Sequence, residues 1–277
     1  MKAAPFGYVR PATLAEAVAE LAAGDGAAKV LAGGQSLVPV LAMRLARPAT
    51  LVDLGAVAEL TVLRRDGDVL EVGAMVRQRQ LEHSAEAAAV PLLEMALPWV
   101  GHRELRSRGT VGGSIAHADP AGELPAVAAC LDAELRVTGP DGERVVPARE
   151  FVTGALSTDL GPAEVLTSVR FPVARPGDGH GFGEVARRHG DFALAGVAVR
   201  VRGEEAVLTA FGVSDRPVTR DVSDLLRAPD LERAAAALAV ELVDTAGDVH
   251  ASADYRRHLL AGLIARELAA AAGKERR

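Results

Sequence analysis

Hydrophobic and polar positions change their period along the chain, and each period predicts a different kind of element. Near the N-terminus, Leu14, Val18 and Leu21 share one face of a helix. Glu16 follows Thr13 by three residues, as in a capping box. The expected elements here are a helix from Thr13 to Gly24, strands at 29–32 and 51–54, and a helix at 37–45. The first 55 residues therefore predict an α/β unit with at least two strands.

Pairs of short alternating strands replace this pattern between residues 56 and 175. Two such pairs surround Asp66-Gly67 and Asp141-Gly142, dipeptides that favour a tight turn between antiparallel strands. The expected hairpins join 60–64 to 69–74 and 134–138 to 144–147, with helical segments at 86–97 and 124–131. The middle of the chain therefore predicts an α+β unit.

A break in the pattern follows at 175–179, where two glycines and a proline oppose both helix and central strand. We place a domain boundary there, which gives a first domain at 1–175, with subdomains of about 1–55 and 56–175, and a second at 176–277. The second domain is expected to hold antiparallel strands at 182–188, 194–201 and 206–213 and helices at 231–243 and 253–272. It therefore predicts a small three-stranded sheet covered by helices.

Composition and charge narrow the class of protein. The chain has 277 residues, of which 49% are hydrophobic, so it is long enough to bury a large core. Its net charge is −6 and it has no basic block, which argues against a dedicated nucleic-acid binder. The longest uncharged run, 30–43, is shorter than the roughly 20 apolar residues of a membrane span. The N-terminus lacks the apolar stretch of a secretory signal, so we expect a cytoplasmic protein without a membrane span.

The first candidate for chemistry is the pair Gly33-Gly34, which lies between an expected strand and an expected helix. Glycine allows positive φ and a close approach to a ligand, and the N–H groups that open a helix attract an anion. A phosphate group could bind there. A glycine pair before a helix is also a common plain turn, and the Rossmann pattern of three glycines is absent.

A second pair, Gly112-Gly113, stands between two hydroxyl residues, Thr110 and Ser114. Both hydroxyls can donate to a phosphate oxygen, alongside main-chain N–H groups. Because a dinucleotide carries two linked phosphates, two separate loops in one domain suit it well. If both pairs are only turns, the chain is a non-catalytic binding module.

Three segments, 29–39, 108–120 and 250–257, together resemble the FAD-binding medium subunit of molybdenum hydroxylases, the carbon monoxide dehydrogenase and xanthine dehydrogenase family. They follow the order and spacing of that family, and the resemblance covers nearly the whole chain. It implies a vanillyl-alcohol-oxidase-type (PCMH-type) FAD-binding domain of two subdomains. A C-terminal domain with a three-stranded antiparallel sheet and helices would follow.

The resemblance also implies where FAD is held. The two glycine loops would bind its diphosphate mainly through backbone groups, and Glu123 would contact the flavin polyol, where Asp is usual. Leu166 would pack near the flavin, and Phe192 stands where relatives often carry Tyr. The expected FAD-binding residues are Lys29, Val30, Leu31, Ala32, Gly33, Gly34, Gln35, Ser36, Leu37, Thr110, Val111, Gly112, Gly113, Ser114, His117, Glu123, Leu166 and Phe192.

Other reactive residues do not form sites of their own. Among the histidines only His117-x-Asp119 has ligand spacing, and it lies within the second loop, so no metal site is expected. Ser36 lacks the histidine and aspartate of a nucleophilic triad. Cys130 is the single cysteine and is expected to be a buried, inert thiol, whereas an iron–sulfur cluster commonly takes four thiolates. We expect no catalytic side chain here.

The function implied by the resemblance is electron transfer within a heterotrimer that itself pairs into a dimer. A large molybdopterin subunit would hydroxylate the substrate, and a small [2Fe-2S] subunit would relay electrons to FAD on this chain. NAD, a quinone or oxygen would be the electron acceptor. Two alternatives remain: a stand-alone FAD-dependent oxidase, and the non-catalytic binding module.

Overall fold

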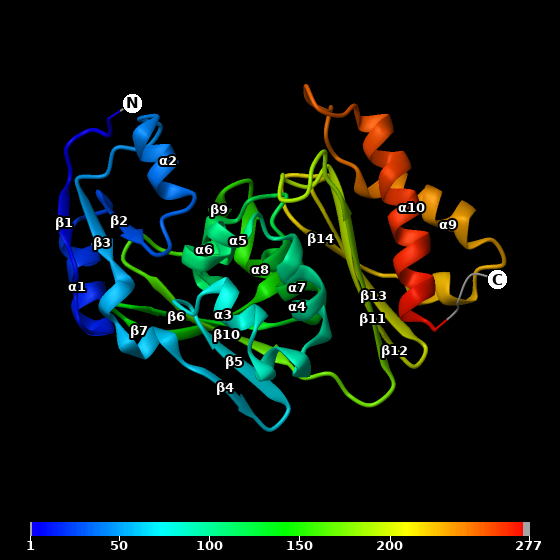
Figure 1. The fold of residues 1–277 in the computed structure, drawn as a ribbon, viewed down its shortest axis with the longest axis horizontal. Helices are drawn as coiled ribbons and strands as arrows, with labels where there is room; N and C mark the ends of the chain where they lie inside the picture. Colours follow the sequence, from blue (N-terminus) through cyan, green and yellow to red (C-terminus); the bar gives the residue numbers. More distant parts are fainter. Residues whose placement is uncertain (1, 274–277) are drawn as a thin grey trace.

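The N-terminal unit is a small parallel sheet flanked by helices. A computed structural model describes residues 2–273 of the chain (Figure 1). The elements of this unit are β1 (Gly7–Val9), α1 (Leu14–Ala23), β2 (Ala28–Leu31), α2 (Leu37–Ala42), β3 (Thr50–Asp53) and the 3₁₀-helices η1 (Leu54–Ala56) and η2 (Ala58–Thr61). The strands run parallel in the order β1-β3-β2, so the predicted α/β unit is confirmed. The capping box of Thr13 and Glu16 is present, whereas α2 ends three residues earlier than expected.

The middle unit is built on a five-stranded antiparallel sheet in the order β4-β5-β10-β6-β7. Its strands are β4 (Leu63–Asp66), β5 (Val69–Gly73), β6 (Glu134–Gly139), β7 (Gly142–Pro147) and β10 (Val165–Pro172), and a small separate sheet pairs β8 (Val152–Gly154) with β9 (Ser157–Thr158). Both predicted hairpins are confirmed. The central strand β10 joins them and was not predicted, although glycine and proline residues at 161–162 and 175–179 flank it.

Short helices connect these strands. They are α3 (Gln78–Glu82), η3 (Ala85–Ala89), α4 (Pro91–Ala96), η4 (Leu97–Trp99), α5 (Arg103–Arg108), α6 (Val111–His117), α7 (Glu123–Leu131) and α8 (Ala148–Phe151). The expected helix at 124–131 is confirmed as α7. The helical segment expected at 86–97 is confirmed as helical, but it is divided into η3, α4 and η4. Pro91 opens α4, and since proline has no N–H and disfavours a helical residue before it, one helix cannot run through.

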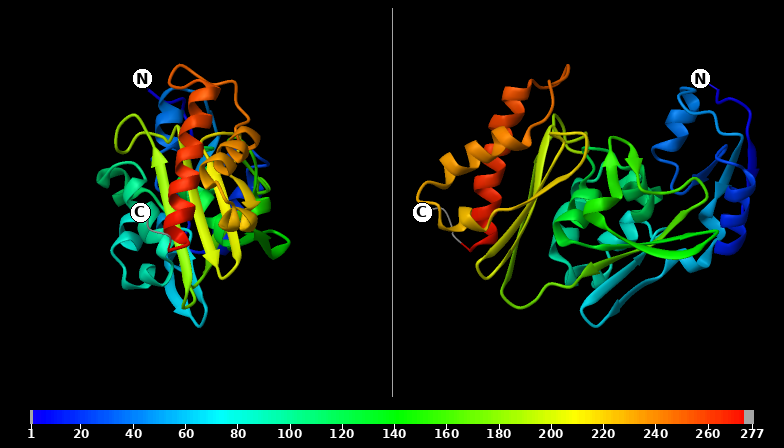
Figure 2. Two further views of the ribbon diagram at one scale, coloured as in Figure 1. Left: turned by 90° about the vertical axis from the view of Figure 1, so that its right-hand side faces the viewer. Right: turned by 180° about the vertical axis from the view of Figure 1, so that it is seen from behind.

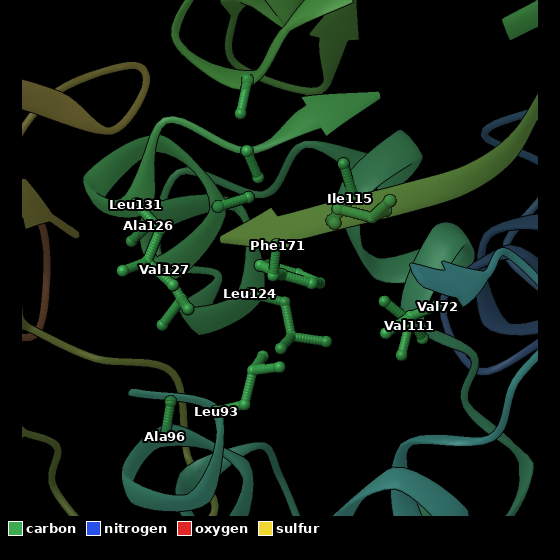
Figure 3. Close-up of a cluster of buried hydrophobic side chains, with 14 of the residues drawn as sticks. Val72, Leu93, Ala96, Val111, Ile115, Leu124, Ala126, Val127, Leu131 and Phe171 are labelled. Carbon is green, nitrogen blue, oxygen red and sulfur yellow. The ribbon is translucent and has the colours of Figure 1, made fainter. Parts of the chain in front are cut away.

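The main core lies between the middle sheet and helices α4, α6 and α7. Every residue of α7 is buried, and Leu124, Val127 and Leu131 belong to the same cluster as Phe171 of β10 (Figure 3). Val111 and Ile115 anchor α6 in this core. The start of α6 carries the second glycine pair, and its position is therefore fixed by well-packed core side chains.

The C-terminal unit has a four-stranded antiparallel sheet in the order β11-β12-β13-β14. Its elements are β11 (Asp178–Val185), β12 (Ala195–Arg202), β13 (Glu205–Phe211), β14 (Val218–Asp221), η5 (Ser223–Arg227), α9 (Leu231–Leu242) and α10 (Ala253–Ala271). The expected count of three strands is wrong, since β14 adds a fourth. With a single apolar residue, Val218, this strand has no visible alternation. The break at 175–179 is also shorter than expected, because β11 begins at Asp178.

The two faces of this sheet have different neighbours (Figure 2). Helix α10 packs on β11 and β12 from outside, and a Cβ atom at Gly181 would lie 2.5 Å from the carbonyl oxygen of Glu267. The opposite face meets α4 and α7 of the middle unit, where Phe182 stacks on Phe211 with ring centroids 5.8 Å apart. The predicted packing of the last helix within this domain is confirmed. In residues 2–273, none of the helices combines the length and the apolar composition needed to cross a bilayer.

Candidate functional site

The two glycine loops are far apart in sequence but lie in direct contact. A Cβ atom at Gly33 would lie 2.8 Å from the Cα atom of Gly109 and would collide with the carbonyl oxygen of Arg108. A Cβ atom at Gly113 would lie 3.3 Å from that of Ala32. Any side chain at Gly33 would therefore push the loops apart. The sequence expectation that both loops serve one site requires this contact.

The first loop presents a row of free main-chain donors. Within residues 2–273, the N–H groups of the five residues 33–37 have no hydrogen-bond acceptor. Gly34 has a φ of +74°, which turns the chain at this point. The side-chain amide of Gln35 donates to the carbonyl oxygen of Gly33 at 2.9 Å, and this hydrogen bond stabilises the bend. Successive free amides around a left-handed residue form a concave site for an anion.

The second loop differs from the sequence expectation. Gly112 and Gly113 lie inside the first turn of α6, and the N–H groups of 111–114 all have acceptors within the chain. Gly112 donates to the carbonyl oxygen of Ala74 at 2.9 Å, and Gly113 donates to the Thr110 hydroxyl at 3.0 Å. The expected row of free amides is therefore wrong for this loop. Its remaining donors are the N–H of Thr110 and the hydroxyl groups of Thr110 and Ser114.

Arg77 is a residue of this region that the sequence did not reveal. Its guanidinium group donates to the carbonyl oxygen of Arg108, and its backbone forms an antiparallel bridge with Thr110. Burial and the neighbouring Arg108 lower the pKa of Arg77, which nevertheless stays cationic because a guanidinium group is a very weak acid. The Arg77 guanidinium thus stands where the two loops meet, and the charge of Arg108 is near enough to act on it. No motif connects positions 77 and 108, so only the fold could show this pairing.

The other expected FAD-binding residues occupy several elements. Lys29, Val30 and Leu31 lie in β2, and Ala32 follows. His117 is the last residue of α6, Glu123 is the first of α7, and Leu166 is buried in β10. Phe192 belongs to the other domain and is 72% exposed. The structure thus joins 29–37 to 108–114, while Phe192 stands on the surface between β11 and β12.

A second cluster lies where the two domains meet. Glu123 is buried, and the loss of solvent, aided by Asp119, raises its pKa to about 7. Glu184 of β11 is also buried, and its burial together with the charge of Glu123 raises its pKa to about 8. Neither carboxyl oxygen of Glu184 has a hydrogen-bond partner in residues 2–273. The sequence did not single out Glu184, because β11 also carries Asp178 and His180 and nothing in the strand distinguishes its second acidic residue.

The segment 186–192 docks on the middle unit beside this cluster. His189 stacks on Trp99 with ring centroids 5.7 Å apart, and Gly190, at a φ of +87°, lies against the ring of His102. The sulfur atom of Cys130 in α7 lies 3.3 Å from the carbonyl oxygen of Ala198 in β12. Its complete burial, which is as predicted, raises the pKa of the thiol to about 12. The inertness of the thiol stays a prediction.

The site meets the chemical needs of a dinucleotide. A diphosphate needs several donors and positive charge, and the amides at 33–37 with Arg77 and Arg108 offer both. A polyol needs groups that donate and accept, and buried carboxyl groups stand at the domain boundary. The requirement for glycine at position 33 is explained by close packing of the loops. FAD contains both a diphosphate and a polyol, so these residues fit it.

Comparisons with known proteins agree with this chemistry. Residues 4–174 match the family described as the FAD binding domain in molybdopterin dehydrogenase, and residues 180–271 match the CO dehydrogenase flavoprotein C-terminal domain. The nicotine 6-hydroxylase medium subunit of Paenarthrobacter nicotinovorans is 38% identical over 99% of this chain and 100% of its own length. Two solved structures each align with 99% of this chain and with 99% of their own chain. Carbon monoxide dehydrogenase from Hydrogenophaga pseudoflava superposes with a TM-score of 0.93 at 32% identity, and quinoline 2-oxidoreductase from Pseudomonas putida 86 with 0.88 at 36%.

Proposed function

This chain belongs to the family of FAD-binding medium subunits of molybdenum hydroxylases, and from that premise we propose that it transfers electrons between a [2Fe-2S] partner subunit and a terminal acceptor. The partners would be a small [2Fe-2S] subunit and a large molybdopterin subunit. Bound FAD supplies the ability to collect electrons and pass them on in pairs. The acceptor would be NAD, a quinone or oxygen.

The contact between the two glycine loops is the observation that carries this proposal. It places five unpaired amides at 33–37 next to Thr110, Arg77 and Arg108. These groups would hold the FAD diphosphate, with most backbone donors coming from the first loop. Because they are already in position, little reorganisation would be needed on binding.

The remaining residues would orient the cofactor rather than react with substrate. Glu123 would hold the polyol, Leu166 would pack near the flavin, and Phe192 would lie at the exposed end of the site. The domains at 1–175 and 176–277 would enclose FAD from two sides. This division of labour leaves the hydroxylation itself to the large subunit.

The first test is the flavin content of the purified full-length chain. We expect a yellow protein that binds one FAD and has no activity on an organic substrate by itself. Co-expression with a small [2Fe-2S] subunit and a large molybdopterin subunit from the same host should give a complex in which substrate reduces FAD. A chain that takes up no FAD from an excess of the cofactor would contradict the proposal.

The electron route is tested separately. In the purified complex, cysteine substitutions in the small subunit that remove its clusters should abolish reduction of FAD by substrate. Dithionite should still reduce the same FAD directly. Unchanged reduction by substrate after loss of the clusters would show that electrons reach FAD by another route.

A further inference from the structure

The strand β11 divides its side chains between two neighbours. Gly181 and Gly183 face α10, where Gly183 lies beside Arg266 and Glu267. Because side chains alternate along a strand, Phe182 and Glu184 face the opposite way, toward the FAD-binding domain. Phe182 belongs to the core of that domain. Glu184 is therefore a residue of the C-terminal domain that points across the domain boundary.

Glu184 lacks what a buried carboxyl group normally has. It is only 5% exposed, and both of its carboxyl oxygens are without a hydrogen-bond partner in residues 2–273. A buried polar group left unpaired costs stability, so native proteins rarely keep one without a use. The missing partner must come from outside the described chain. Glu267 of α10, a buried glutamate on the other side of this sheet, is different, because it accepts from Arg266 at 2.6 Å.

Among residues 2–273, no positive charge pairs with Glu184. The charged group that acts on it is Glu123, at the start of α7. Asp119 and Arg106 in turn act on Glu123, and Arg106 is already bound by Glu82. Two buried carboxyl groups, one on α7 and one on β11, are therefore near enough for the charge of Glu123 to act on Glu184.

The other elements that pack on β11 do not supply a cation either. On β12, the residue paired with Glu184 is Gly196, and the nearest same-face cation, Arg200, pairs with His180 four residues away. On α4 the charged residue is Glu94, which is exposed. On α10, Arg266 and Glu267 lie behind the sheet, next to Gly183.

We propose that Glu184 is a further FAD-binding residue, and that together with Glu123 it binds the ribityl hydroxyl groups of the cofactor from the C-terminal domain. This inference rests on the proposed function, in which Glu123 holds the polyol. A hydroxyl group both donates and accepts; a protonated carboxyl group can donate to it and a carboxylate can accept from it. Burial and mutual repulsion raise both pKa values, to about 7 and about 8, so the pair retains a proton at neutral pH.

The pair also explains why both domains are needed for the cofactor. The diphosphate contacts come from the FAD-binding domain alone, whereas the polyol would be held from each side of the boundary. FAD binding would then depend on the C-terminal domain even though the glycine loops lie elsewhere. ADP, which has the diphosphate but no ribityl chain, would not depend on it.

The test compares FAD with ADP on the full-length chain. Glu184→Leu removes the polar group and keeps its approximate volume, and equilibrium dialysis gives both dissociation constants. We expect FAD to bind about tenfold more weakly, as for loss of one buried hydrogen bond, while ADP binding changes less than about twofold. Glu267→Gln is the matched control, a buried carboxyl group on the other side of the same sheet, and should leave both constants unchanged.

Three results would overturn the inference. Wild-type FAD affinity in Glu184→Leu would show that the carboxyl group makes no contact, and equal losses for FAD and ADP would place its effect at the diphosphate. The third result comes from Glu184→Gln. This variant keeps the shape of the side chain and can be used if Glu184→Leu fails to fold. Wild-type FAD affinity should fall between pH 6 and 9 as the pair ionises, and this fall should be smaller in the glutamine variant. Identical pH profiles would contradict the proposal.

These results are distinguishable from failure of the proposed function. If wild-type protein binds no FAD at all, the function itself is wrong. If wild-type protein binds FAD and the Glu184 variants bind it equally well, only the role of Glu184 is lost. An FAD analogue that lacks one ribityl hydroxyl group completes the test, because wild-type protein should discriminate against it and Glu184→Leu should not.

Discussion

At the scale of single residues, the close contact at Gly33 makes the sharpest prediction. Gly33→Ala would place a methyl group against Arg108 and Gly109, so the loops must separate. We expect FAD affinity to fall by at least about tenfold, with a fall of ~1–3 kcal/mol in the free energy of unfolding. Fluorescence titration with FAD and urea unfolding measure the two effects.

Gly262→Ala is the control for this substitution. Gly262 lies in α10 with no atom within 4 Å of an added Cβ, so alanine should be harmless there or stabilising. FAD affinity in Gly33→Ala equal to that of the control would mean that the loops do not hold the cofactor together.

Glu184 makes a second prediction at this scale, for the chain without FAD. Its pKa is raised from 4.5 to about 8, so the folded state prefers the protonated form. The stability that it contributes is present below pH 4.5 and is lost as the pH rises through about 8. Glu184→Gln should therefore gain ~2–4 kcal/mol over wild type between pH 4.5 and 8. Denaturant unfolding across this range measures the gain, and parallel pH profiles would contradict it.

At the scale of secondary-structure elements, the packing of α10 on β11 depends on the absence of side chains. A Cβ atom at Gly181 would lie 2.5 Å from the carbonyl oxygen of Glu267, which is rigid helix backbone. Gly181→Ala should lower the free energy of unfolding by ~1–3 kcal/mol, because the helix must move away from the sheet. Thermal unfolding measures this, and Gly262→Ala on the same helix again serves as control. Equal stability of both variants would show that α10 adjusts without cost.

The elements also show what the sequence could and could not predict. Helix α1 was predictable because Thr13 and Glu16 form its cap locally, and both hairpins were predictable from their turns. Strand β14 was not, because Val218 is its single apolar residue and its pairing with β13 decides it. Pro91 did give a local signal that the stretch at 86–97 is divided. Elements set by neighbouring residues could be predicted from the sequence, whereas elements that depend on distant partners could not.

The same distinction applies to the site. The first loop was predictable, because glycines between a strand and a helix leave amides free. The second loop looked equivalent in sequence, yet its amides bond to Val76 and Ala74, which lie 35 or more residues away. The roles of Glu184 and Arg77 could not be predicted for the same reason, since each depends on a contact or charge from a residue on another element.

At the scale of the whole molecule, Cys130 reports on the contact between the domains. Its sulfur lies against Ala198 of the C-terminal sheet and is fully buried. Thiol reagents should label the native chain very slowly, both because the pKa of the thiol is about 12 and because the domains cover it. FAD should slow labelling further if it binds both domains. Rapid stoichiometric labelling of the native chain, followed with a chromogenic disulfide, would contradict a closed boundary.

The free amides at 33–37 have a consequence for how this loop tolerates mutation. Recognition by the main chain does not read side chains, so Ser36 and Leu37 should accept many replacements without loss of the cofactor. Gly33 should accept none, because its neighbour is another backbone segment. A saturation library selected for flavin content should therefore show two restricted positions, Gly33 and the left-handed Gly34, within an otherwise permissive stretch. Side-chain changes at the other positions of this loop would leave its proposed main-chain hydrogen bonds to the diphosphate intact.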